Sequence, residues 1–170
     1  DDGPSGGALW KFDTTAAVVE GTNPVLVKDL DSSGDMNVMS PVVMGDNLYF
    51  WDSLGSNQEA LIKSDGTADG TEILKTFLGN PKELTVLGST LYFQGFSGWT
   101  GGAELWKSDG TAGGTVQVKN IARNSNYSSQ PSLLTGIGSK LYFAATNHSS
   151  ANIGEANHGF ELFKSDGTSD

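Results

Sequence analysis

Cysteine is absent from the 170 residues of the sequence. Disulfide bonds, thiolate metal sites and cysteine nucleophiles are therefore excluded. Basic residues are also scarce, since 10 lysines and arginines stand against 20 acidic residues and give a formal net charge of -10. This balance argues against nucleic acid as a partner, because proteins that bind phosphate backbones use lysine and arginine to neutralise them.

Long apolar runs are missing as well. No stretch approaches the roughly 18 residues that a membrane-spanning helix needs, so insertion into a membrane is not expected. The first seven residues, Asp1 to Gly7, are polar and lack the apolar region of a signal peptide. We therefore expect a chain that is cytoplasmic, processed, or cut from something longer.

Glycine, by contrast, is abundant, with 23 residues, which is roughly twice its average usage. Glycine is the residue that accepts tight turns and positive φ angles at no steric cost. Charged residues make up only 18% of the chain. Such a composition is typical of a protein rich in turns and strands, and long helices are not expected.

The most informative feature of the sequence is internal repetition. Four segments align without gaps, at residues 8–15, 60–67, 104–111 and 161–168, and the third reads Glu-Leu-Trp-Lys-Ser-Asp-Gly-Thr. A second motif, Leu-Tyr-Phe, recurs at 48–50, 91–93 and 141–143. Further apolar runs follow the Asp-Gly-Thr segment or a proline. Each run is short, rich in β-branched and aromatic residues, and bounded by Gly, Asn, Asp or Pro, which indicates strands.

Repeats of about 50 residues with four short strands have the size of the blades of a β-propeller. Apolar residues at adjacent positions indicate burial of both strand faces, as in sheets that stack face to face. We therefore predict an all-β fold, a single repeat array over 1–170 made of propeller-like, four-stranded antiparallel blades. It comprises a partial blade at 8–30, blades at 40–77 and 81–121, and a partial blade at 131–168. These make thirteen strands, about three and a quarter blades and an incomplete ring with an unpaired strand edge.

The segment 104–111 resembles the repeat known as ELWxxDGT, which occurs in tandem in large bacterial surface or secreted proteins. The Leu-Tyr-Phe strand, the Gly-Thr-Val-Gln-Val-Lys run at 114–119 and the approach at 158–160 also match the usual pattern of that repeat. The first copy departs at 12–15, where Phe-Asp-Thr-Thr replaces Ser-Asp-Gly-Thr. The resemblance covers nearly the whole chain. It implies an extracellular or cell-surface location and an adhesive or matrix role, and it carries over no catalytic residues.

The repeated Ser-Asp-Gly-Thr turn has a sufficient structural explanation. The carboxylates of Asp65, Asp109 and Asp166 can accept N–H groups of the turn, and the glycine that follows each of them accepts a positive φ angle. Enzymatic patterns are thin, because the only histidines are His148 and His158 and no nucleophile stands at a recognisable spacing from a base. Our first hypothesis is a non-enzymatic structural or adhesive module. It would bind protein partners or its own copies through blade stacking or an open strand edge.

The alternative is a carbohydrate-binding, lectin-like propeller. The segments that follow the Leu-Tyr-Phe strands differ from unit to unit, and variable loops on a repeated scaffold are where such proteins recognise ligands. Trp51, Phe96 and Trp99 could offer flat apolar faces to a sugar ring beside the amide of Asn57. It is at least as plausible that these aromatic side chains pack between blades.

A calcium ion is the only cofactor that the sequence suggests. Asp29, Asp31, Ser33 and Asp35 place oxygen ligands at alternate positions, with a glycine between the last two, as in a calcium loop. The corresponding connections of the other units lack carboxylates, so a solvated acidic turn is the simpler interpretation. Asn126 and Asn147 fit the acceptor pattern for N-glycosylation, and in a bacterial protein we expect both to be plain loop asparagines.

Overall fold

The computed structural model describes residues 8–12, 24–30, 38–96, 98, 102–122, 127–147 and 159–168. All regular structure in these residues is β, with thirteen strands and no helix. A helix suited to crossing a membrane is accordingly absent from the described ranges. The predicted all-β class is therefore confirmed.

The strands form four antiparallel sheets, which we number 1 to 4 along the chain. Sheet 1 pairs β1 (Leu9–Lys11) with β2 (Val25–Lys28). Sheet 2 contains β3 (Met39–Met44), β4 (Asn47–Gly55), β5 (Gln58–Ser64) and β6 (Glu72–Leu78). Sheet 3 contains β7 (Lys82–Leu87), β8 (Thr90–Phe96), β9 (Ala103–Ser108) and β10 (Val116–Lys119). Sheet 4 contains β11 (Ser132–Ile137), β12 (Lys140–Ala145) and β13 (Glu161–Ser165).

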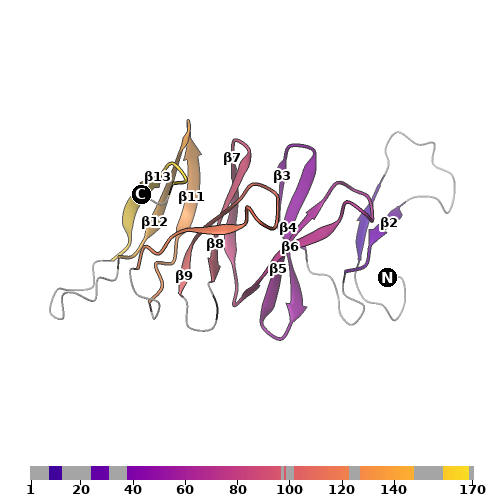
Figure 1. Cartoon of the computed structure of the whole chain (residues 1–170), viewed down its shortest axis with the longest axis horizontal. Coiled ribbons are helices and arrows are strands. Elements are labelled where there is room, and N and C mark those ends of the chain that lie inside the picture. Colours follow the sequence, from indigo (N-terminus) through magenta and orange to yellow (C-terminus); the bar gives the residue numbers. More distant parts are fainter. Residues whose placement is uncertain are drawn as a thin grey trace.

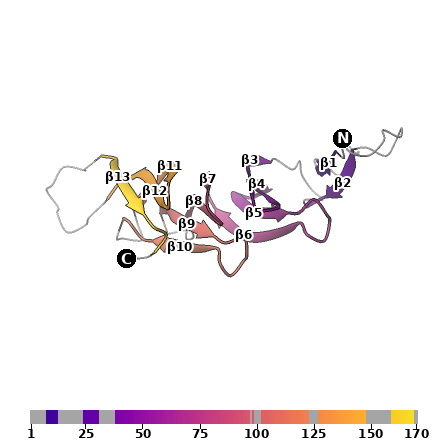
Figure 2. The same cartoon turned by 90° about the horizontal axis from the view of Figure 1, so that it is seen from above.

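Each sheet is a meander, in which strands adjacent in sequence are adjacent in space. The sheets follow one another in a row along the long axis of the molecule (Figure 1), and a view from above shows the same order (Figure 2). Sheets 2 and 3 touch through β3 and β7, and sheets 3 and 4 touch through β7 and β11. The sheets therefore stack in the order of the repeats.

The repeats also share their irregularities. The first strands of sheets 2, 3 and 4 each carry one residue at a positive φ angle, Ser40, Glu83 and Leu133. At each of these places the register with the second strand shifts, which is the mark of a β-bulge. Between β4 and β5, Ser56 and Asn57 both have positive φ angles, as in the tight hairpin turns that match strand twist. All of these positive φ angles are adopted by residues other than glycine. The turns between the first and second strands, by contrast, begin with a glycine at positive φ, at Gly45, Gly88 and Gly138.

The hydrophobic core lies between sheets and not within one of them. We call the face of a sheet on the side of the following repeat its forward face, and the face on the side of the preceding repeat its rear face. In sheets 2 and 3 the forward face packs on the next sheet and the rear face packs on the preceding one. Side chains alternate between the two faces along each strand. Three buried clusters result, one at each junction. This explains why the strands are apolar at adjacent positions.

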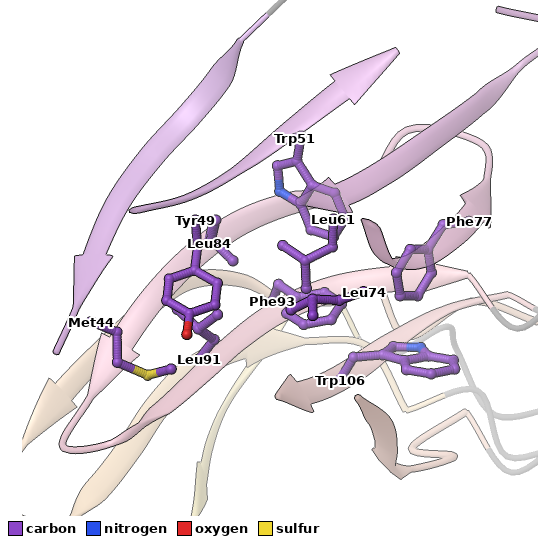
Figure 3. Close-up of a cluster of buried hydrophobic side chains, with 10 residues drawn as sticks. All are labelled: Met44, Tyr49, Trp51, Leu61, Leu74, Phe77, Leu84, Leu91, Phe93 and Trp106. Atoms are coloured by element: carbon purple, nitrogen blue, oxygen red, sulfur yellow. The ribbon is translucent and has the colours of Figure 1, made fainter. Parts of the chain in front are cut away.

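The junction of sheets 2 and 3 contains the largest side chains, which Figure 3 shows. Phe77 makes T-shaped contacts with the rings of Trp51, Phe93 and Trp106, with ring centroids 5.1 to 5.5 Å apart. At the junction of sheets 3 and 4, Ile121 stands in the repeat position of Phe77. At this position the second junction therefore has an aliphatic side chain where the first has an aromatic ring.

Substitution of Phe77 by alanine tests the weight of the junction. We expect the free energy of unfolding to fall by about 3 to 5 kcal/mol, the usual cost of removing a buried aromatic ring. Urea denaturation measures this change. In the same sheet, Val43 is 66% exposed, so Val43→Ala should stay within about 0.5 kcal/mol of the parent protein. A similar loss in both variants would contradict a core placed between the sheets.

Candidate functional site

The Asp-Gly-Thr turns have one hydrogen-bond pattern in three copies. After β5, Asp65 Oδ1 accepts hydrogen bonds from the backbone N–H of Thr67 at 2.8 Å and from its hydroxyl at 2.7 Å. The hydroxyl oxygen of Ser64 accepts one from the N–H of Gly66 at 3.1 Å. The turns at 108–111 and 165–168 repeat all three bonds at 2.6 to 3.1 Å. The carboxylate acts as the sequence predicted, as an acceptor for the turn.

A pair of buried hydroxyl groups closes each complete hairpin. The hydroxyls of Ser64 and Thr71 lie 2.7 Å apart, and Thr71 donates to the carbonyl of Thr67 at 2.6 Å. In the next unit Ser108 and Thr115 repeat the contact at 2.8 Å. All of these hydroxyls are satisfied inside the hairpin, so the turn is a structural element and presents no unpaired hydroxyl nucleophile.

Hydrogen bonding lowers the pKa of the three turn carboxylates, Asp65, Asp109 and Asp166. The largest cause in each case is the hydrogen bond from the threonine hydroxyl two residues later, followed by that from its backbone N–H. A nearby lysine lowers each pKa further. These carboxylates therefore stay ionised well into acid and are unsuited to proton transfer near neutral pH.

A tyrosine of one sheet lies under the turn of the next. Gly110 has a φ angle of +88°, and a Cβ atom there would run into the Tyr49 hydroxyl. Gly167, at +86°, stands in the same relation to Tyr92. Burial raises the pKa of both phenols, and the turn carboxylate of the next sheet adds to this. The Leu-Tyr-Phe and Asp-Gly-Thr motifs thus meet across the junction of sheets 2 and 3 and across that of sheets 3 and 4, which spacing within one unit could not indicate.

Lysines at repeat positions also cross the junctions. Lys28 of sheet 1 donates to the carbonyls of Thr71 at 2.7 Å and Ala68 at 3.1 Å, both next to the turn of sheet 2. Lys107 of sheet 3 donates to the carbonyl of Gly167 at 2.7 Å. The Lys75 ammonium lies 5.3 Å from the ring centroid of Trp106. These positive charges serve inter-sheet contacts, and the sequence alone did not reveal them as such.

Of the predicted sugar-binding residues, the three that the structure describes, Trp51, Phe96 and Asn57, do not form one exposed platform. Trp51 is only 1% exposed and lies within β4, where its ring packs on Phe77 and Phe93. Its expected place in a loop was wrong, because strand β4 continues to Gly55 and the tight turn begins only there. Buried in this way, the ring has no face left for a ligand. The other aromatic interpretation, packing between sheets, is the one realised here.

Phe96 lines a hollow between sheets 2 and 3, whereas Asn57 is not among the residues that line it. Phe96 ends β8, is half-buried, and comes close to Gly79. Asn57 is exposed, and its carbonyl accepts a hydrogen bond from the N–H of Gly79 at 3.1 Å. The hollow has a volume of about 500 Å³ and is lined by Phe96 and Gln58 among others. Trp99, the fourth predicted residue, lies outside the described residues.

The predicted calcium loop is covered only at its start. Asp29 is half-buried, whereas Asp31, Ser33 and Asp35 lie outside the described residues. Within the described ranges no group of three or more His, Asp or Glu side chains could hold a metal ion. Asn126, His148 and His158 also lie outside them. The calcium site therefore stays a prediction.

The described chain leaves the forward face of sheet 4 uncovered. Leu162 is 78% exposed, although the same repeat position in sheets 2 and 3 is filled by Leu61 and Leu105, which are at most 1% exposed. Ile137 is 61% exposed, in the position where Met44 is buried. Exposed apolar side chains gathered on one face mark an interaction surface. Repeat equivalence shows which kind of surface covers such a face, namely the rear face of another sheet.

Comparison of the chain with protein-family models, with curated proteins and with solved structures gave no significant match.

Substitution of Gly110 by alanine tests the contact between turn and tyrosine. We expect a loss of about 1 to 3 kcal/mol in the free energy of unfolding, because alanine is strained at this φ angle and its methyl group meets the Tyr49 hydroxyl. In a Tyr49→Phe background the loss should be smaller, since the hydroxyl is gone. Gly113, which has open space around it, supplies the control Gly113→Ala, and this variant should be nearly neutral. An equal loss from Gly110→Ala in both tyrosine and phenylalanine backgrounds would rule the contact out.

Substitution of Thr111 by valine tests the turn hydrogen bond through pH. Because the pKa of Asp109 is lowered in the folded state, its stabilising effect is complete above the unfolded carboxyl pKa, near 4. The effect disappears as the pH falls through the folded value. In Thr111→Val, an NMR titration should show a higher pKa for Asp109 and a weaker loss of stability in acid. Thr76→Val, an exposed change outside the turn, should leave the pKa of Asp109 where it was.

Proposed function

We propose that the chain is a non-enzymatic structural or adhesive module that associates with further copies by continuing the stack of its sheets. The observation that carries the proposal is the uncovered forward face of sheet 4, where Leu162 and Ile137 are exposed although the same repeat positions in sheets 2 and 3 are buried or partly buried. Burying one such side chain contributes about 1.5 to 3 kcal/mol. A few of them therefore favour association strongly once a complementary surface arrives.

The opposite end of the described chain offers a surface of the complementary kind. Trp10 and Leu26 are neighbours across β1 and β2, and they are 42% and 44% exposed. Trp10 occupies the repeat position of Trp106, whose ring packs against the forward face of sheet 2. Contact between the rear face of sheet 1 and the forward face of sheet 4 would join copies head to tail. Such heterologous contacts build rings or open filaments.

The resemblance to the ELWxxDGT repeat supports a surface or secreted location for this module, and we propose a propeller-like array as its architecture. Both the propeller-like architecture and the association of copies rest on the stacking of successive sheets. In the part of the chain that the structure describes, the hydroxyls and carboxylates of the turns are engaged within their hairpins, so they do not favour a catalytic role. A carbohydrate-binding role is the weaker candidate, because Trp51 is buried and Phe96 is half-covered beside Gly79.

Substitution of Leu162 by aspartate tests the proposal. Analytical ultracentrifugation of the parent chain should show reversible association that grows with concentration, and Leu162→Asp should shift the equilibrium to monomers by at least about tenfold in Kd. Val43→Asp, an equally exposed apolar position elsewhere, is the matched control and should associate as the parent does. Trp10→Asp should weaken association if the contact is head to tail. A parent chain that stays monomeric at high concentration contradicts the proposal.

A further inference from the structure

The outer edge of β13 is a second open feature of sheet 4, distinct from its forward face. Within the described residues β13 pairs on one side only, with β12. In sheets 2 and 3 the equivalent strands β5 and β9 pair on both sides, and their outer neighbours are β6 and β10. Figure 1 shows β13, in yellow, at the margin of its sheet. An unpaired edge presents N–H and C=O groups in the spacing that another strand needs.

A groove of about 400 Å³ runs beside this edge, between β10 and β13. Its floor is apolar and comes from both sheets, with Phe143 and Phe163 stacked at a centroid distance of 5.7 Å opposite Val118 and Ile121. At the preceding junction the repeat positions of Ile121 and Phe163 carry the larger Phe77 and Trp106, and β10 lies beside them. The groove is therefore the place that a fourth strand of sheet 4 would cover.

The rim of the groove is polar and carries lysine side chains. Lys140 is paired with Asp166 at 3.3 Å, while Lys119 and Lys164 are exposed along the rim. Asn147 also lines the groove, and its Oδ1 atom is buried with no hydrogen-bond partner among the described residues.

We propose that this groove takes an extended peptide strand, which adds to β13 as the fourth strand of sheet 4. Such strand addition derives its affinity from main-chain hydrogen bonds and its specificity from alternate side chains. The strand β10, which fills this place in sheet 3, supplies one such pattern, with Val116 and Val118 two positions apart beside β9. The partner is therefore a segment with β-branched residues two positions apart, and a carboxylate in it would meet Lys119 or Lys164.

The direct experiment titrates the protein with an eight-residue peptide of the β10 sequence, Gly-Thr-Val-Gln-Val-Lys-Asn-Ile, and follows amide resonances by NMR. The Leu162→Asp variant serves as the protein, so that self-association through the forward face does not interfere. We expect shifts confined to the residues around the groove, at 118–121, 140–147 and 161–168, together with slower hydrogen exchange of β13 amides. A peptide with proline in place of both its first valine and its glutamine should bind at least about tenfold more weakly. These two residues are adjacent and in register with β9 in the parent strand, so one of the two prolines removes a ladder donor. A peptide with glutamate in place of its lysine should bind more tightly.

A matched pair of variants places the peptide on the groove. In the Leu162→Asp protein, Phe163→Ala removes part of the floor and should weaken binding at least about tenfold, whereas Ile137→Ala changes an exposed residue of the opposite, forward face and should leave binding unaltered. Equal binding of the proline peptide, or unchanged affinity in Phe163→Ala, overturns the proposal. So does slow exchange of β13 amides in the free protein at high dilution, which would show an edge that is already paired. Competition by an acidic oligosaccharide in place of the peptide would assign the groove to another ligand.

Discussion

The stacking of apolar sheet faces is the interaction on which the rest of this structure depends. Sheets 2 and 3 carry apolar side chains on both faces. A single sheet cannot bury its own faces, so each needs a neighbouring sheet on either side. The junction of sheets 2 and 3 shows the solution, with Phe77 held among Trp51, Phe93 and Trp106. The buried apolar area and the van der Waals contacts lie mainly at the junctions between sheets. The stability of each repeat therefore comes largely from its neighbours, as in other repeat proteins.

Polar contacts fix how the sheets sit on one another. The turn glycine at Gly110 leaves room for the Tyr49 hydroxyl, and lysines such as Lys107 reach the carbonyls of the next turn. Glu104 has a similar role inside its own unit, where its buried carboxylate accepts hydrogen bonds from Ile121 and Ser129 and ties β9 to the connection after β10. Apolar faces alone could slide over one another, so these directional bonds select a single register.

The same constraint gives the proposed functions their physical basis. A junction that recurs along the chain leaves the forward face of sheet 4 with Leu162 and Ile137 exposed and the edge of β13 with one neighbour among the described residues. The face suits another sheet, and the edge suits a strand. Neither needs a catalytic group. The two surfaces lie on one strand but belong to its opposite faces, which is why Leu162 and Phe163 can separate them experimentally.

The sequence by itself determined the all-β class, the repeat period and the turn chemistry, because these depend on local patterns: short apolar runs bounded by turn residues, glycine in the turns, and an aspartate two residues before a threonine. It could not determine which side chains meet across a junction. Trp51 was expected in a loop and lies in the core, and the partnership of Tyr49 with Gly110 joins residues 61 positions apart. Such contacts depend on how sheets are placed against each other. Only the tertiary structure decided them, because packing acts between units while the sequence pattern describes one unit at a time.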